Sequence, residues 1–210
     1  MTAIDQTAIE RLGIPRLLLM EHAGMAVAAA VRALAAPPAA VAACCGGGFN
    51  GGDALAALRL LHHDGYRTAA ILTTPPAALR GEPAVYARIL QRLGVRLMDA
   101  AGPARVRDAA FAAAAVLIDG LLGIGLRGPV REPAAGLIRR MNAARAPVVA
   151  VDLPSGLDGD DGSVHGYAVR ATVTVACGLA KQGCLRGQGP AHTGRLMVDD
   201  ITFPPALLTP

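Results

Sequence analysis

The chain has 210 residues, of which 53% are hydrophobic and 3% aromatic, and a formal net charge of +4. This hydrophobic content excludes a disordered chain, and the length indicates a single domain, 1–210, with one core. Scattered arginines and scarce aromatic rings speak against nucleic-acid binding, and the spacing of the four cysteines speaks against zinc. Asp5 and Glu10 fall where a signal peptide needs apolar residues, so we expect a cytoplasmic protein without a membrane segment.

The chain order of helical and apolar patterns predicts the fold class. Helices are expected at 2–12 and 16–36, and the apolar part of the second, interrupted by Arg32, suits a buried helix. Apolar runs then alternate with helical patterns, which predicts an α/β fold: a three-layer α/β/α Rossmann-like sandwich around a mostly parallel sheet. The expected strands are 39–45, 68–73, 95–98, 115–119, 147–152, 172–177 and an edge strand at 195–198, and the expected helices between them are 53–64, 83–93, 104–112 and 133–144.

Three glycine-containing loops follow expected strands, at 46–53, 120–129 and 153–158. The carboxyl ends of parallel strands lie at one edge of the sheet, where α/β proteins bind ligands, so these loops should converge there. The first loop reads GGGFNGGD and leads into a helix, an arrangement suited to holding phosphate. We therefore expect a nucleotide-like ligand at this edge.

Two glycine spacings match the dinucleotide-binding fingerprint, Gly46-x-Gly48-x-x-Gly51 and Gly123-x-Gly125-x-x-Gly128. The second expected strand, however, ends without the carboxylate that holds a ribose in the usual NAD-dependent dehydrogenase. A P-loop is excluded because no Lys-Ser/Thr pair follows the glycines. A conventional NAD-dependent oxidoreductase is therefore disfavoured.

Individual polar residues in these loops allow two interpretations each. Asp53 either caps its helix or contacts a ligand, and Asn50 is either a left-handed turn residue or a neutral oxygen donor for a cation. Asp119 and Asp152 end apolar strands, where a carboxylate needs a cation, a hydroxyl or an N–H partner. Lys181, the one lysine of the chain, is either an acid/base or ion-pair group or a solvated surface residue.

Five segments, in this order and spacing, together resemble the NAD(P)H-hydrate epimerase family, also called the YjeF N-terminal domain. They cover most of the chain, and their joint occurrence is far more specific than a glycine pattern alone. The segments are LMEHAG at 19–24, CGGGFNGGD at 45–53, DGLLGIGLRG at 119–128, VDLPSGLD at 151–158 and GLAKQG at 178–183.

The resemblance implies an enzyme of metabolite repair that interconverts the R and S epimers of hydrated NADH and NADPH. A separate or fused dehydratase would then restore the cofactor. It also implies a homodimer and one potassium ion per subunit, with Asn50, Asp119 and Ser155 as its ligands. The hydrated cofactor would be bound by Phe49, Asn50, Gly51, Gly52, Asp53, Gly123, Ile124, Gly125, Leu126, Arg127, Gly128, Pro129 and Asp152.

For the chemistry we expect Asp152 and Lys181 to form the acid/base pair, because epimerisation of the hydroxyl-bearing carbon needs proton transfer. The sequence departs from the family at Phe49, which stands in place of an Asn, and at Ala54, in place of a Gly. The alternative interpretation is a non-catalytic nucleotide-binding or scaffold module on the same fold.

Overall fold

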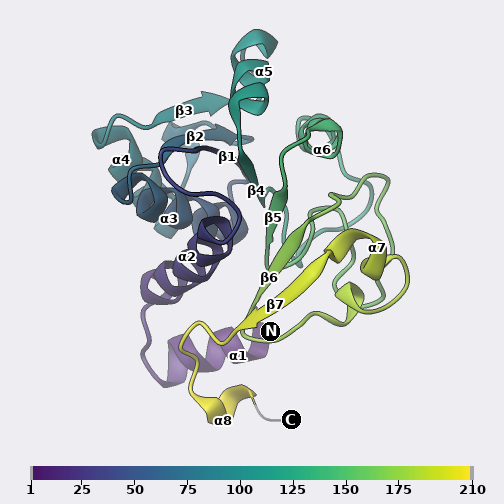
Figure 1. Ribbon diagram of the computed structural model, residues 1–210. Coiled ribbons are helices and arrows are strands. Elements are labelled where there is room, and N and C mark those ends of the chain that lie inside the picture. Colours follow the sequence, from purple (N-terminus) through teal and green to yellow (C-terminus); the bar gives the residue numbers. More distant parts are fainter. Residues whose placement is uncertain (1, 209–210) are drawn as a thin grey trace.

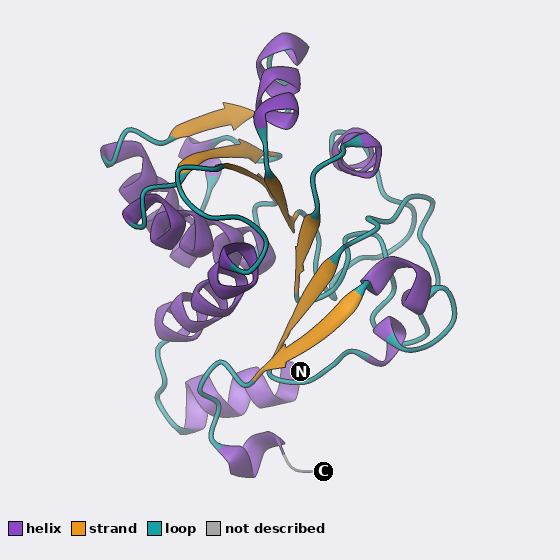
Figure 2. Ribbon diagram, viewed as in Figure 1, coloured by secondary structure: helices purple, strands orange, loops and turns teal. Residues whose placement is uncertain are grey.

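A parallel β-sheet organises the molecule. In the computed structural model, which describes residues 2–208, seven strands run parallel in the order β3-β2-β1-β4-β5-β6-β7 (Figures 1 and 2). Every predicted strand is present to within two residues, and the expected edge strand is β7. The strands are β1 Ala40–Cys45, β2 Arg67–Leu72, β3 Arg96–Asp99, β4 Val116–Gly120, β5 Val148–Val151, β6 Val173–Cys177 and β7 Arg195–Asp199.

Helices connect the strands. The helix expected at 2–12 is α-helical only to Gln6, α7 and α8 were not expected, and two further helices differ from the prediction by four residues at one end. The helix α3 begins at Phe49 rather than residue 53, because the extended Gly48 is its N-cap and the second half of the glycine run is already helical. The helix α2 ends at Arg32, four residues early. The α-helices are α1 Thr2–Gln6, α2 Arg16–Arg32, α3 Phe49–His63, α4 Gly81–Arg92, α5 Ala104–Ala113, α6 Ala134–Ala143, α7 Gly189–Thr193 and α8 Pro205–Leu208, and a π-helical turn, Thr7–Arg11, follows α1.

The helices cover both faces of the sheet, which confirms the α/β sandwich (Figure 1). Alternate residues of a strand point to opposite faces. Val41 and Cys45 of β1 pack with the cluster formed by α2, α3 and α4, whereas Ala42 and Cys44 pack with α5 and α6. No helix among residues 2–208 is long and apolar enough to cross a bilayer.

The two ends of the chain meet at the carboxyl edge of the sheet, where α1 and α8 lie beyond the ends of β6 and β7 (Figure 1). Ala8 is buried against Cys177 of β6 and against Ile201 and Phe203 of the segment that follows β7. Burial of these apolar side chains stabilises the packing of the N-terminal helices across this edge. They therefore form one wall of the space above the strand ends.

Candidate functional site

A cavity of about 810 Å³ lies at the carboxyl edge of the sheet. The loops that follow β1 and β4 line it, together with Asp152 after β5 and Lys181 after β6, so the predicted convergence of the first two loops is confirmed. The third loop, 153–158, contributes no lining residue and instead contacts the loop after β4 through Ser155. Of the residues expected to bind substrate or to act on it, those in the cavity wall are Phe49, Asn50, Asp53, Gly123, Ile124, Gly125, Leu126, Arg127, Asp152 and Lys181.

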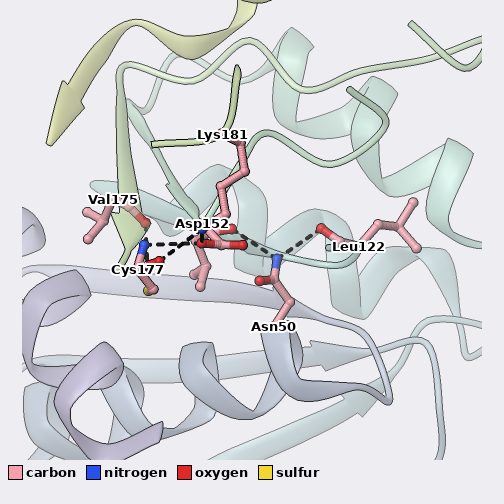
Figure 3. Close-up of polar contacts among 7 residues, drawn as sticks. Asn50, Leu122, Asp152, Val175, Cys177 and Lys181 are labelled. Carbon is pink, nitrogen blue, oxygen red and sulfur yellow. Dashed lines mark hydrogen bonds and ion pairs between the residues drawn. The ribbon is translucent and has the colours of Figure 1, made fainter. Parts of the chain in front are cut away.

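Lys181 and Asp152 form an ion pair in this cavity (Figure 3). Only 6% of the Lys181 surface is exposed, and its ammonium also donates a hydrogen bond to the Cys177 carbonyl at 2.9 Å. The Asp152 carboxylate accepts a further hydrogen bond from the Cys177 N–H at 3.1 Å. The interpretation of Lys181 as a solvated surface residue is therefore wrong, and the expected pairing with a carboxylate is confirmed.

The backbone at Asp152 is strained. Its φ angle of 68° lies in the left-handed region, which non-glycine residues rarely adopt. The conformation turns the chain sharply at the end of β5, where the Asp152 N–H still donates to the Val175 carbonyl of the neighbouring β6 at 2.8 Å. Such strain persists where surrounding contacts impose it and is concentrated at functional sites.

Beneath the cavity, Asp119 and Ser155 form a second polar cluster, and both are fully buried. The Ser155 hydroxyl lies 2.6 Å from Asp119 Oδ1, to which it donates, and the Ser155 N–H donates to Oδ2 at 2.8 Å. Burial raises the pKa of Asp119 to about 6, while these hydrogen bonds oppose the rise. The carboxylate at the end of β4 thus has the hydroxyl and N–H partners that its position requires.

Asn50 links this cluster to the cavity. Its side-chain amide donates hydrogen bonds to the Leu122 carbonyl at 2.9 Å and to the Val151 carbonyl at 3.0 Å (Figure 3). The Leu122 N–H in turn donates to the Ser155 hydroxyl at 2.9 Å. Asn50 lies in the first turn of α3 and not in a left-handed turn, so that interpretation is wrong. The three residues expected to hold potassium therefore lie together, joined through Leu122.

Asp53 does not cap its helix, because α3 starts four residues earlier and Gly48 occupies the N-cap position. It lines the cavity instead. Burial, reinforced by the nearby carboxylates of Asp152 and Asp5, raises the pKa of Asp53 well above its ordinary value, and Lys181 opposes the rise. Of the two interpretations of Asp53, a helix cap or a ligand contact, the position in the cavity wall is compatible only with the ligand contact.

The remaining predicted residues lie outside the cavity wall. Gly51 and Gly52 pack behind it: a Cβ at Gly51 would lie 2.0 Å from the Gly46 carbonyl oxygen, and one at Gly52 would lie 2.5 Å from the end of the Met20 side chain. Gly51 is needed there because the obstructing atoms are backbone, whereas at Gly52 the flexible Met20 side chain would have to move. Gly128 and Pro129 belong to the same loop as the lining residues but do not contribute to the lining.

The prediction missed part of the wall. Asp5 and Ile9 reach the cavity from the N-terminal helices, Arg16 from the start of α2, and Ile201 from the segment after β7. Arg16 lies over the Phe49 ring, 4.3 Å from its centroid, as a cation–π pair. Thr73, Leu121 and Cys177 lie at the ends of β2, β4 and β6, and these lining residues could have been found from their places at strand ends.

Fold and site define a Rossmann-like α/β protein with a ligand cavity at the carboxyl edge of its sheet. Within this class the chain belongs to the YjeF-related protein N-terminus family, whose model matches residues 16–183.

Two relatives show the range of the family. An NAD(P)H-hydrate epimerase of Limosilactobacillus fermentum is 43% identical over 95% of this chain and 93% of its own length. A bifunctional NAD(P)H-hydrate repair enzyme, Nnr, of Pyrobaculum aerophilum is 40% identical over 98% of this chain, which spans only 41% of that relative. The crystal structure of the yeast protein ynu0 has the same fold, with a TM-score of 0.79 at 22% identity, over 95% of this chain and 88% of that one.

Proposed function

We propose that the chain is an NAD(P)H-hydrate epimerase, which interconverts the R and S forms of hydrated NADH and NADPH. One observation carries the proposal: in a member of this family, the loops that follow β1 and β4 enclose a cavity that also contains the Asp152–Lys181 ion pair. A scaffold module has no need of a buried ion pair in a ligand cavity.

Binding uses the two glycine-containing loops. The N-terminus of α3, a helix of 15 residues, faces the cavity through Phe49 and Asn50 and favours negative charge, as a pyrophosphate carries. Arg16 and Arg127 add positive charge to the same wall. The Phe49 ring, 53% exposed, gives a flat surface for a base or a nicotinamide ring in place of the family's amide.

The chemistry concerns the ring carbon that bears the hydroxyl next to the ring nitrogen. That hydroxyl takes up a proton and leaves as water, while the nitrogen lone pair forms a C=N bond. Water then adds to the opposite face of the ring and gives a proton to Asp152, whose carboxylate is held in place by the ion pair with Lys181. No electrons are gained or lost, so the reaction needs no redox partner.

A potassium ion fits the donor set of Asn50, Asp119 and Ser155, which offers an amide, a carboxylate and a hydroxyl oxygen, all hard donors. Asp119 is fully buried, and within residues 2–208 its carboxylate pairs with no basic side chain. A bound cation would supply the missing positive charge and fix the loops that follow β4 and β5. We propose one such ion per subunit.

The partner that consumes the product is a dehydratase. Two relatives that are longer than this chain are named bifunctional NAD(P)H-hydrate repair enzymes, which supports a second activity that acts with the epimerase. Here the epimerase would work with a dehydratase on a separate or fused domain, in the cytoplasm where reduced nicotinamide cofactors are used. We propose a homodimer as the assembly.

The test uses a mixture of both epimers of hydrated NADH and a dehydratase that accepts only one. An epimerase makes the whole mixture convertible to NADH, followed by absorbance, whereas a scaffold leaves one epimer unconsumed. The variant Asp152→Asn should lower turnover by about 100-fold or more with the circular dichroism spectrum unchanged. Wild-type turnover in that variant would remove Asp152 from the chemistry.

A further inference from the structure

The cavity contains two carboxyl groups besides the Asp152–Lys181 pair. Asp5 enters it from α1 and Asp53 from α3. Among the described residues, the charges that act on Asp5 are those of Asp152, Lys181 and Arg16, and Asp5 in turn acts on Asp53. Acids from two helices and from the end of β5 thus form one electrostatically coupled cluster.

The charges of this cluster do not balance if every acid is ionised. Lys181 compensates Asp152 through their ion pair, and Arg16 stacks on the Phe49 ring. A carboxyl group that lacks its own counter-charge is neutral at lower cost than ionised in a poorly hydrated space. Burial, with the neighbouring Asp152 carboxylate as the second cause, raises the pKa of Asp5.

Of the two extra acids, Asp5 is placed to exchange a proton with a ligand. It is half-buried and lies on α1. Ile4 of α1 and Ile9 of the π-helical turn that follows pack against the cluster of Cys177, Ile201 and Phe203. This packing fixes the helix across the carboxyl edge, where Asp5 lines the cavity. Asp53 also lines the cavity, but it lies more than one turn inside α3 and only three residues after Asn50, which is assigned to the cation.

We propose that Asp5 is the general acid of the epimerase, the group that protonates the departing hydroxyl; this inference rests on the proposed function. The Asp5 O–H bond breaks as the hydroxyl takes the proton and leaves as water, with the ring nitrogen forming the C=N bond. Returning water gives a proton to Asp152. That proton then passes from Asp152 to Asp5, which restores both groups, so that no co-reactant is consumed.

The test compares Asp5→Asn and Asp5→Glu with Asp160→Asn, an equivalent change at an exposed acid outside the cavity wall. With the full chain in the coupled epimer assay, Asp5→Asn should lower kcat about 100-fold or more, with KM changed less than about threefold. Asp5→Glu should restore at least part of the rate, and Asp160→Asn should match the wild type. In addition, wild-type kcat should fall at alkaline pH as Asp5 loses its proton, and this fall should be absent from the residual rate of Asp5→Asn.

A measurement without substrate tests the same carboxyl group. A carboxyl whose pKa is raised by folding destabilises the folded state as the pH rises through the folded-state pKa. The stability of Asp5→Asn relative to wild type, from urea unfolding, should therefore increase between pH 4 and pH 8.

Several results would overturn the proposal. The first is a kcat of Asp5→Asn within threefold of that of an active wild type. The second is a fall of kcat at alkaline pH that is unchanged in Asp5→Asn. The third is a difference in stability between Asp5→Asn and wild type that does not vary with pH. An inactive wild type would instead overturn the epimerase activity, and this proposal with it.

Discussion

The close approach of the first loop to the loop after β4 can be tested at Gly46. A Cβ at this position would lie 2.0 Å from the Leu121 carbonyl oxygen, and the Gly46 N–H donates to the Gly120 carbonyl at 2.9 Å. The obstructing atom is backbone, so no rotation of a flexible side chain can relieve the overlap. Gly46→Ala therefore forces the two loops apart at the point where the cavity wall is built.

The size of the effect follows from this geometry. Overpacking a well-packed site costs about 1–3 kcal/mol, and an overlap with fixed backbone belongs at the upper end, about 3 kcal/mol. For a domain of this size that corresponds to a decrease in Tm of about 6–12 °C. Gly48 is the matched control: it is the N-cap of α3, and a Cβ there meets nothing within 4 Å. Gly48→Ala should cost less than about 1 kcal/mol, the loss of a good N-cap residue.

Urea unfolding followed by circular dichroism measures both variants, and the coupled epimer assay reports the state of the cavity. Gly46→Ala should be the less stable variant by about 2 kcal/mol or more, with a reduced rate at a temperature where it is still folded. Equal stabilities of Gly46→Ala and Gly48→Ala would show that the two loops do not approach each other as the structure describes.

Three further predictions concern binding, the cation and pH. Arg16→Gln should raise KM for hydrated NADH about tenfold with kcat little changed, because it removes positive charge from the wall beside the α3 N-terminus; a loss confined to kcat in steady-state kinetics would contradict this. Replacing potassium by choline should lower the rate and the Tm reversibly, and no response of either would exclude the ion. Hydrogen bonds from the Asp160 N–H, from His165 and from the Asp161 N–H lower the pKa of Asp158. The ionised carboxylate therefore stabilises the folded state above its unfolded-state pKa, and this stabilisation is lost as the pH falls through its folded-state pKa. Asp158→Asn should therefore cost stability at pH 7 but not at pH 2, measured by urea unfolding, and an equal cost at both pH values would refute this origin.

The sequence was sufficient to predict the sheet and the place of the site, for a physical reason. Strands buried on both faces are continuous apolar runs, and a carboxylate at the end of such a run, as at Asp119 and Asp152, is conspicuous because it is costly to bury. Parallel pairing then brings these ends to one edge. The roles of the residues there remain predictions, because position alone does not reveal chemistry.

Local propensity concealed other features of the site. Gly51 and Gly52 disfavour a helix, which led to the wrong start of α3. The close approach of Gly51 to the backbone of Gly46 nevertheless makes glycine necessary at that position. The walls contributed by Asp5 and Ile201 depend on how the two chain ends pack on the sheet edge. Periodicity within one segment carries no information about such tertiary contacts.

The ion pair between Asp152 and Lys181 depends on a single strand pairing. The Asp152 N–H donates to the Val175 carbonyl, its carboxylate accepts from the Cys177 N–H, and Lys181 donates to the Cys177 carbonyl, so the last residues of β6 hold both partners. These contacts exist because β5 pairs with β6 in the register Val151 to Val175. A slip of one residue would turn every side chain of a strand to the opposite face, which the buried valines on both sides of the sheet oppose. The hydrophobic pattern that specifies the sheet therefore also fixes the position of the Asp152 carboxylate.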